Sequence, residues 1–121
     1  MVRKWKWELY LNSIEKLAIE KLKNELLKID GVVKVILFGS KVRGDFPRKS
    51  SIKSGESDID ILIIIEDLSS KDAVIKCVSE IELEYDIVLS PVIYTLKEYE
   101  TNLKLKSPFF ERIENEGISL L

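Results

Sequence analysis

Hydrophobic positions along the chain follow two different periods, one typical of helices and one typical of strands. Between residues 13 and 29 they recur every three or four residues, which predicts an amphipathic helix that Asn12 or Ser13 can cap and Gly31 can end. The β-branched run Val32–Phe38 follows at once and predicts a strand. The helical stripe consists of Ile14, Leu17, Ala18, Leu22, Leu26 and Ile29.

A second strand is predicted over Asp58–Ile65 and a third over Glu84–Ile93. Alternation places Asp58 and Asp60 on the face that Leu62 and Ile64 continue. Isoleucines fill the opposite face, so the second strand is expected to be buried on both sides, with its carboxylates at the mouth of the core. These isoleucines are Ile59, Ile61, Ile63 and Ile65.

Capping signals predict three further helices. Ser69 with Asp72, and Thr95 with Glu98, have the spacing of a capping box. Ser107-Pro108 supplies a cap and a first-turn proline for the last helix, and a short helix is expected after the first strand. The resulting order of elements predicts an α/β (α+β) fold, in which helices cover a small mixed β-sheet. Buried positions of the helix after Ser69 are Val74, Cys77, Val78 and Ile81, and Gly117 is placed to end the last helix.

The length of 121 residues is that of a single domain, 1–121. Residues 1–12 are expected to form an N-terminal extension, in which the alternating segment around Trp5 and Trp7 is either an edge strand or an irregular lead into the first helix. Residues 45–56 contain Pro47 and Gly55 among serines and basic residues, and predict a long flexible loop.

Composition excludes several kinds of chemistry. The chain has no histidine and one cysteine, so Ser-His-Asp, Cys-His and His-ligated zinc sites are excluded, as is an internal disulfide. The formal net charge of -2 gives no indication of nucleic-acid binding. The apolar run Ile61–Ile65 is far shorter than the roughly 20 residues that cross a bilayer. A cytoplasmic location without membrane association is therefore expected, and carboxylates must carry any catalysis.

Asp58 and Asp60 are the candidate metal ligands. The strand period places them on one face about 7 Å apart along the backbone, where they can share Mg²⁺. Two such ions would neutralise a nucleoside triphosphate and activate the attacking hydroxyl group. Asp86 on the third strand is the expected third acid, and Glu84 is the alternative.

A phosphate site is predicted where the first strand ends. Gly39 lets the backbone approach an anion, and Ser40 can donate hydrogen bonds from its amide and hydroxyl groups. Lys41 and Arg43 follow within reach, and Arg43 has the better geometry for a phosphate. A single Asp-x-Asp or Gly-Ser is usually ordinary turn chemistry. The combination of both with an apolar strand favours a catalytic site.

The segments Gly39-Ser40-Lys41-Val42-Arg43-Gly44 and Ser57-Asp58-Ile59-Asp60-Ile61 resemble the signature of the DNA polymerase beta-like nucleotidyltransferase superfamily. The length resembles its minimal nucleotidyltransferase (MNT) branch, and the similarity extends from about Ile14 to the closing Phe109-Phe110-Glu111-Arg112-Ile113 and Glu116-Gly117. The Gly-Ser turn and the acidic pair lie about half a dozen residues further apart than in that family. Residues 49–56 therefore resemble an insertion, which could cover the nucleotide or contact a partner.

The resemblance implies a nucleotidyltransferase fold and Mg²⁺-dependent transfer of AMP from ATP. Asp58, Asp60 and Asp86 match the metal triad, and Gly39, Ser40 and Arg43 match the nucleotide-binding turn. MNT proteins are commonly antitoxins that adenylylate a tyrosine of a HEPN ribonuclease toxin, which would be the partner in a hetero-oligomer. Three alternatives stay open: an antitoxin that acts by binding alone, a small-molecule acceptor such as an aminoglycoside, for which a homodimer could supply the missing surface, and an RNA acceptor.

Overall fold

A computed structural model describes residues 3–4, 11–39, 42 and 58–121 of the chain. In this part of the chain the strands form one sheet, in the order β1-β5-β2-β3-β4. The strands are β1 (Arg3–Lys4), β2 (Val32–Phe38), β3 (Ile59–Ile65), β4 (Leu89–Thr95) and β5 (Ile118–Ser119). The helices are α1 (Ser13–Leu27), the 3₁₀ turn η2 (Leu68–Ser70), α3 (Lys71–Tyr85), α4 (Leu96–Lys104) and α5 (Pro108–Glu116).

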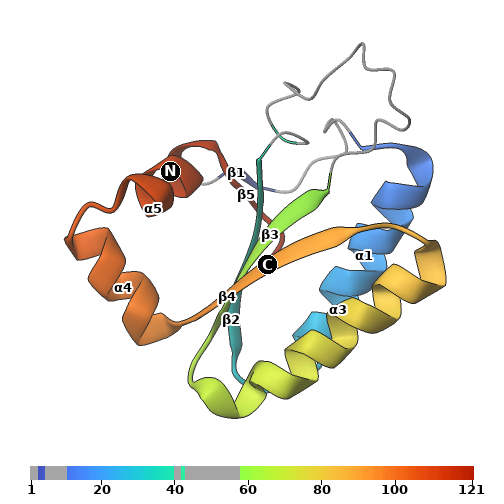
Figure 1. Cartoon of the computed structure of the whole chain (residues 1–121), viewed down its shortest axis with the longest axis horizontal. Helices are drawn as coiled ribbons and strands as arrows, with labels where there is room; N and C mark the ends of the chain where they lie inside the picture. Colours follow the sequence, from blue (N-terminus) through green and yellow to red (C-terminus); the bar gives the residue numbers. More distant parts are fainter. Residues whose placement is uncertain (1–2, 5–10, 40–41, 43–57) are drawn as a thin grey trace.

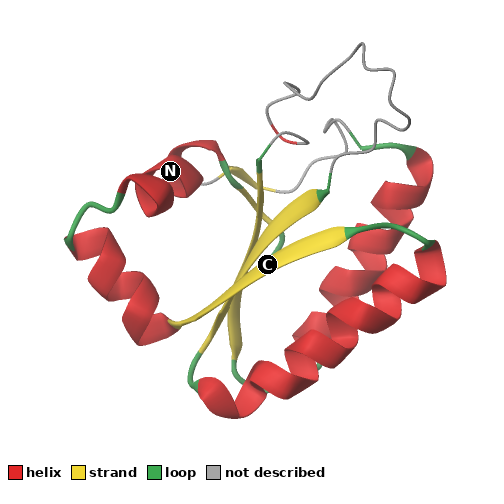
Figure 2. Cartoon of the chain, in the orientation of Figure 1, coloured by secondary structure: helices red, strands yellow, loops and turns green. Residues whose placement is uncertain are grey.

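Helices cover both faces of the sheet (Figure 1). Figure 2 shows α1 and α3 side by side on one face, and α4 and α5 on the other. Strand β2 runs antiparallel to β3 and β5, whereas β3 runs parallel to β4. The sheet is therefore mixed and covered by helices, which confirms the predicted fold class.

Strand β3 lies at the centre of the fold because apolar side chains fill both of its faces. Its isoleucines at odd positions pack in the large cluster under α1 and α3, while Leu62 and Ile64 pack in a smaller cluster under α4 and α5. Asp60 shares the face of Leu62 and Ile64, as the strand period predicts. The odd positions are Ile59, Ile61, Ile63 and Ile65.

Several predicted helix ends are confirmed by their caps. The Asn12 side chain accepts from the backbone N–H of Glu15 (2.8 Å) while the Glu15 side chain accepts from the N–H of Asn12 (2.9 Å). Thr95 and Glu98 form the same reciprocal pair at the start of α4. Helix α5 begins at Pro108 after Ser107, whose side chain makes no capping hydrogen bond, and Gly117 follows its last residue. Polar side chains therefore predicted the helix starts well. The predicted end of α1 at Gly31 is too late, because the helix already ends at Leu27.

The predicted Ser69–Asp72 capping box is wrong. The side chain of Asp67 instead accepts from the backbone N–H of Ser69 (2.9 Å) and starts the short turn η2, and α3 follows from Lys71. Asp67 accepts the same Ser69 N–H that the predicted capping box would give to Asp72, so the capping residue lies two positions before Ser69. The expected burial of Cys77 in α3 is confirmed, and this burial raises the pKa of its thiol.

The predicted third strand, Glu84–Ile93, begins too early. Helix α3 continues to Tyr85, and β4 starts only at Leu89. The helix extends because Val78, Ile81 and Tyr85 continue its apolar stripe against the core. Strand β4 then lies at an edge of the sheet, where Pro91 is tolerated because a missing N–H costs little there.

Other differences concern the surface and the chain ends. Ile14 and Leu17, expected in the buried stripe of α1, are 54% and 61% exposed. Strand β5 was not predicted, and β1 places an edge strand at Arg3–Lys4, just before the tryptophan segment. The segment with Trp5 and Trp7, the short helix expected after β2 apart from Val42, and the 45–56 loop lie outside the described residues. In the described part of the chain, no helix is long and apolar enough to span a membrane.

Candidate functional site

The candidate site begins at Gly39, where β2 ends. Its φ of +86° lies in the left-handed region that favours glycine. A Cβ atom at this position would overlap a carboxylate oxygen of Asp60 and would stand 3.0 Å from its Cγ. Glycine is therefore required here for two reasons, the backbone conformation and the closeness of the Asp60 carboxylate. Gly39 and Asp60 belong to different motifs of the sequence, and the fold brings these two residues into direct contact.

Strand pairing explains why Gly39 and Asp60 meet. Phe38 is the partner of Asp60 in the antiparallel β2–β3 register, so Gly39 follows directly after this pair. Asp60 is half-buried and takes part in further interactions, whereas Asp58 is exposed just before β3 begins. Because the backbone N–H of Ile59 donates to the carbonyl of Val88 (3.1 Å), the parallel ladder to β4 already starts beside Asp58.

Val42 packs back on the core. Its backbone N–H donates to the carbonyl of Gly39 (3.0 Å), and its side chain is buried under α1 and α3. Gly39, the first residue of the predicted phosphate segment, lies at the same end of the sheet as Asp60. Ser40, Lys41 and Arg43, predicted to bind phosphate, lie outside the described residues.

The predicted third acid is not on a strand. Asp86 follows the last residue of α3 and has a left-handed conformation (φ 55°), which aspartate tolerates better than most residues. The strand residue that pairs with Asp60 is Ser90. The alternative acid, Glu84, is on the outer side of α3, with a carboxylate oxygen 3.4 Å from Lys21 Nζ. The hydrogen bond and charge of Glu84 raise the pKa of Lys21.

Carboxylates such as Asp58 and Asp60 have the chemistry to bind a magnesium ion together with a substrate. Among the described residues, no three Asp, Glu or Cys side chains are close enough to hold a metal together, so Asp86 does not complete a cluster with Asp58 and Asp60. Magnesium typically keeps waters and binds through one or two carboxylates plus substrate phosphates. Asp60 beside the glycine turn, with Asp58 two residues before it in the chain, offers two such carboxylates, but they do not make a cage of protein ligands.

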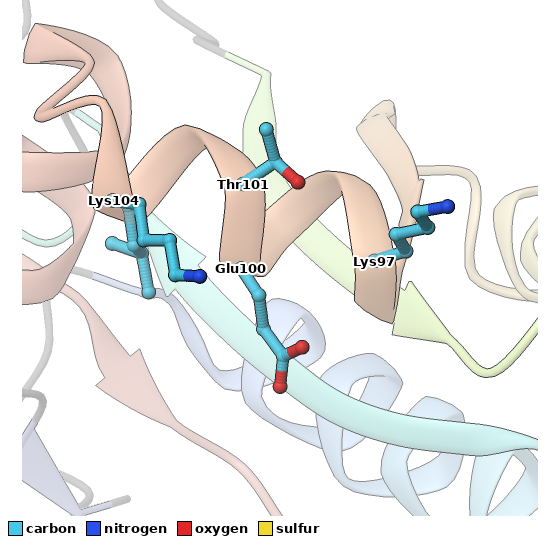
Figure 3. Close-up of a pocket in the computed structure, with 5 residues that line it drawn as sticks. Lys97, Glu100, Thr101 and Lys104 are labelled. Atoms are coloured by element: carbon cyan, nitrogen blue, oxygen red, sulfur yellow. The ribbon is translucent and has the colours of Figure 1, made fainter.

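A surface hollow of about 460 Å³ lies elsewhere, on α4. Its described lining residues all belong to this one helix, and Figure 3 shows the amino groups of Lys97 and Lys104 with the Glu100 carboxylate between them. Ligand sites normally gather polar groups from several elements. A hollow lined by one helix does not have this form, and it shares no described lining residue with the site at Gly39 and Asp60.

An aromatic group borders the acids and was not predicted as part of the site. The rings of Phe38 and Phe109 are in edge-to-face contact, with centroids 5.6 Å apart and an interplanar angle of 86°. The sequence showed Phe109 only within the closing segment. The missing signal is the contact between α5 and the end of β2, which local periodicity does not reveal.

Comparison with known proteins adds independent information. A model of the family described as "Polymerase beta, Nucleotidyltransferase" matches residues 20–121. A Methanocaldococcus jannaschii protein named "Putative protein adenylyltransferase" is 35% identical over 107 residues, covering 84% of this chain and 94% of that protein. A crystal structure described as a "putative nucleotidyltransferase" from Sulfolobus solfataricus is 19% identical, with a TM-score of 0.39 over 75% of this chain and 81% of that chain. The family match includes Gly39, Asp58, Asp60 and Phe109.

Proposed function

Since the chain belongs to the polymerase beta nucleotidyltransferase family and is a nucleotidyltransferase, we propose that it transfers AMP from ATP to a hydroxyl group of a partner protein. The hydroxyl oxygen would attack the α-phosphorus, and the bond to the β-phosphate would break with release of pyrophosphate and the hydroxyl proton. The protein acceptor is suggested by the name of the 35% identical relative, a protein adenylyltransferase. The observation that carries the proposal is the contact between Gly39 and Asp60, which brings the predicted phosphate turn next to a predicted metal ligand.

Asp58 and Asp60 would hold magnesium together with the phosphates of ATP. The bound metal would neutralise the triphosphate and lower the pKa of the attacking hydroxyl group. The Asp60 carboxylate lies against Gly39, and this contact would hold it in place beside the turn. Asp58 is exposed and can reach a ligand that enters from solvent. Gly39 leaves room for the phosphates to approach the backbone. We assign phosphate contacts to Ser40, Lys41 and Arg43 on their position in the motif.

We propose a hydroxyl of a HEPN toxin, that of a tyrosine, as the acceptor, so that the chain acts as an antitoxin in the cytoplasm. The fold is compatible with a large acceptor, because in the described part of the chain helices cover both faces of the sheet. Such an acceptor would approach the end of the sheet at Asp58, where β3 begins, and would bring its own surface. This specific partner rests on the resemblance to the MNT branch.

Radioactive transfer tests the chemistry directly. The protein, a HEPN toxin encoded beside it, Mg²⁺ and ATP labelled on the α-phosphate should yield a labelled toxin if the proposal is right, and Asp58→Asn with Asp60→Asn should abolish the label. Asp72→Asn is the matched control because it removes an exposed carboxylate near the opposite end of the sheet. Label retained by the double variant would refute the role of the acidic pair.

Asp86→Asn separates the two views of the third acid. Asparagine also tolerates the left-handed conformation, so the fold should be kept. Because Asp86 joins no three-carboxylate group in the described structure, we expect less than a tenfold fall in transfer, against complete loss for Asp60→Asn. An equal loss of AMP transfer in Asp86→Asn and Asp60→Asn would show that Asp86 belongs to the metal site of the active protein.

A second candidate function is neutralisation of the toxin by binding alone, in which Asp58 and Asp60 carry no chemistry. The Asp58→Asn, Asp60→Asn double variant also separates these two. If catalysis protects the cell, growth in the presence of the toxin should be lost with this variant while the complex still forms. Growth that persists would favour binding alone.

A further inference from the structure

Phe109 is a large aromatic side chain that the core does not absorb. It is 38% exposed, whereas its neighbour Phe110 is only 2% exposed and packs against Tyr94 and Tyr99. Both residues belong to the first turn of α5. Isolated exposed apolar residues are common and need no explanation. The position of Phe109, however, is not arbitrary.

The Phe109 ring lies beside the candidate site. It contacts Phe38 edge to face, and Phe38 is both the register partner of Asp60 and the residue before Gly39. Partners in an antiparallel pair have Cα atoms about 5 Å apart. The two phenylalanines therefore form one aromatic surface next to both the metal-binding acid and the phosphate turn. Phe38 is half-buried, and Phe109 is the exposed ring of this aromatic surface.

A nucleotide has the matching distribution of groups. Its triphosphate is anionic and needs the metal and the turn, while its base is a flat ring that gains energy from stacking on aromatic side chains. The ribose alone separates the base from the α-phosphate, so a nucleotide whose α-phosphate is bound near Asp60 carries its base close to this point. Phe38 and Phe109 are the aromatic residues that the described structure places beside this point.

We propose that Phe109, supported by Phe38, is the stacking platform for the base of the nucleotide substrate. This inference rests on the nucleotidyl transfer proposed above and adds a specificity-determining residue to it. Stacking on a phenylalanine reads the size of the ring rather than its hydrogen-bonding edge. Purine triphosphates should therefore bind more tightly than pyrimidine triphosphates, with little distinction between ATP and GTP from this surface.

Binding measurements with and without a base test the proposal. Isothermal titration in Mg²⁺ should show that Phe109→Ala raises the Kd for ATP about tenfold, the usual cost of losing one stacked ring, while the Kd for inorganic tripolyphosphate stays unchanged. Phe109→Tyr keeps the ring and should keep ATP binding. Leu105→Ala is the control because it truncates another exposed apolar residue, 73% exposed, just before α5.

Each outcome has a defined meaning. An equal rise of both dissociation constants would show that Phe109 only supports the fold or the phosphate turn, and would overturn the platform. Unchanged ATP binding with a raised KM for the acceptor protein would place the acceptor on this surface instead, and would overturn it as well. Transfer is not needed for these readouts. A protein that binds ATP through Phe109 but labels no partner would refute the proposed function alone.

Discussion

At the scale of single residues, Gly39 shows what the structure adds to the sequence. The sequence predicts a glycine that lets a phosphate approach the backbone, and the structure places the Asp60 carboxylate beside this position. A strand period of two is a local property, so the shared face of Asp60, Leu62 and Ile64 could be predicted. The contact between Gly39 and Asp60 could not, because it depends on the register between β2 and β3.

Gly39→Ala should therefore damage both stability and activity. The new methyl group would overlap the Asp60 carboxylate, and alanine in a left-handed conformation costs about 1 kcal/mol before any overlap. We expect urea unfolding to show a loss of about 2 kcal/mol or more, together with loss of AMP transfer.

A double-mutant cycle separates the overlap from the backbone strain. In an Asp60→Ala background the carboxylate is absent, so Gly39→Ala should cost less than in the wild-type protein. The remaining cost reflects the φ of +86°. Equal costs in the two backgrounds would show that the side chain of Asp60 moves aside freely, and that the contact does not organise the site.

Asp86 shows the limit of local patterns. The residues from Glu84 onward are apolar and β-branched enough to predict a strand, but tertiary packing of Tyr85 extends α3 instead. A boundary between helix and strand is decided by what each side chain packs against, and no local period contains that information. Because β4 begins only at Leu89, Asp86 is not on a strand and has no strand face.

At the scale of elements, α4 and α5 are joined by a buried polar contact. The Tyr99 hydroxyl donates to the Glu114 carboxylate, and Tyr99 is only 3% exposed. Burial, followed by the hydrogen bond to Glu114, raises the pKa of the Tyr99 hydroxyl well above its ordinary value. The capping boxes of α1 and α4 could be predicted from adjacent residues. This contact spans fifteen positions and could not be.

Tyr99→Phe should weaken the attachment of these two helices. Loss of the hydrogen bond leaves the half-buried Glu114 without this donor, which costs about 1.5 kcal/mol and lowers the Tm by about 5 °C. Differential scanning calorimetry at pH 8 measures the change. Tyr94→Phe is the matched control, because it removes a hydroxyl from the same aromatic cluster and leaves the Tyr99–Glu114 contact intact.

The same variant carries a pH signature. Because the pKa of Tyr99 is raised on folding, its contribution to stability is complete below the unfolded value of about 10 and is lost as the pH rises above it. The stability gap between wild type and Tyr99→Phe should therefore shrink between pH 9 and pH 11. A gap that stays constant over this range would contradict a Tyr99 pKa raised by folding.

At the scale of the whole molecule, the sheet divides the protein into two unequal cores. The cluster under α1 and α3 gathers side chains from both helices and four strands, whereas the cluster under α4 and α5 is much smaller. In the described part of the chain, the three seven-residue strands (β2, β3 and β4) and the four longer helices were predicted, because each carries a strong period or a cap. The two-residue strands β1 and β5 are too short to carry either.

This asymmetry predicts that the molecule opens from one side first. Local unfolding free energy follows the apolar area that a unit buries, so the α4–α5 layer should open before the rest of the protein. In native-state hydrogen exchange at low urea, amides of α4 and α5 should exchange through an opening of lower free energy than those of β3 and α3. A single shared opening free energy for all four elements would show that the two cores unfold together.

Nucleotide binding should slow hydrogen exchange in α5 more than in α3. Phe109 belongs to α5, in the less stable layer, and contacts the candidate site through Phe38.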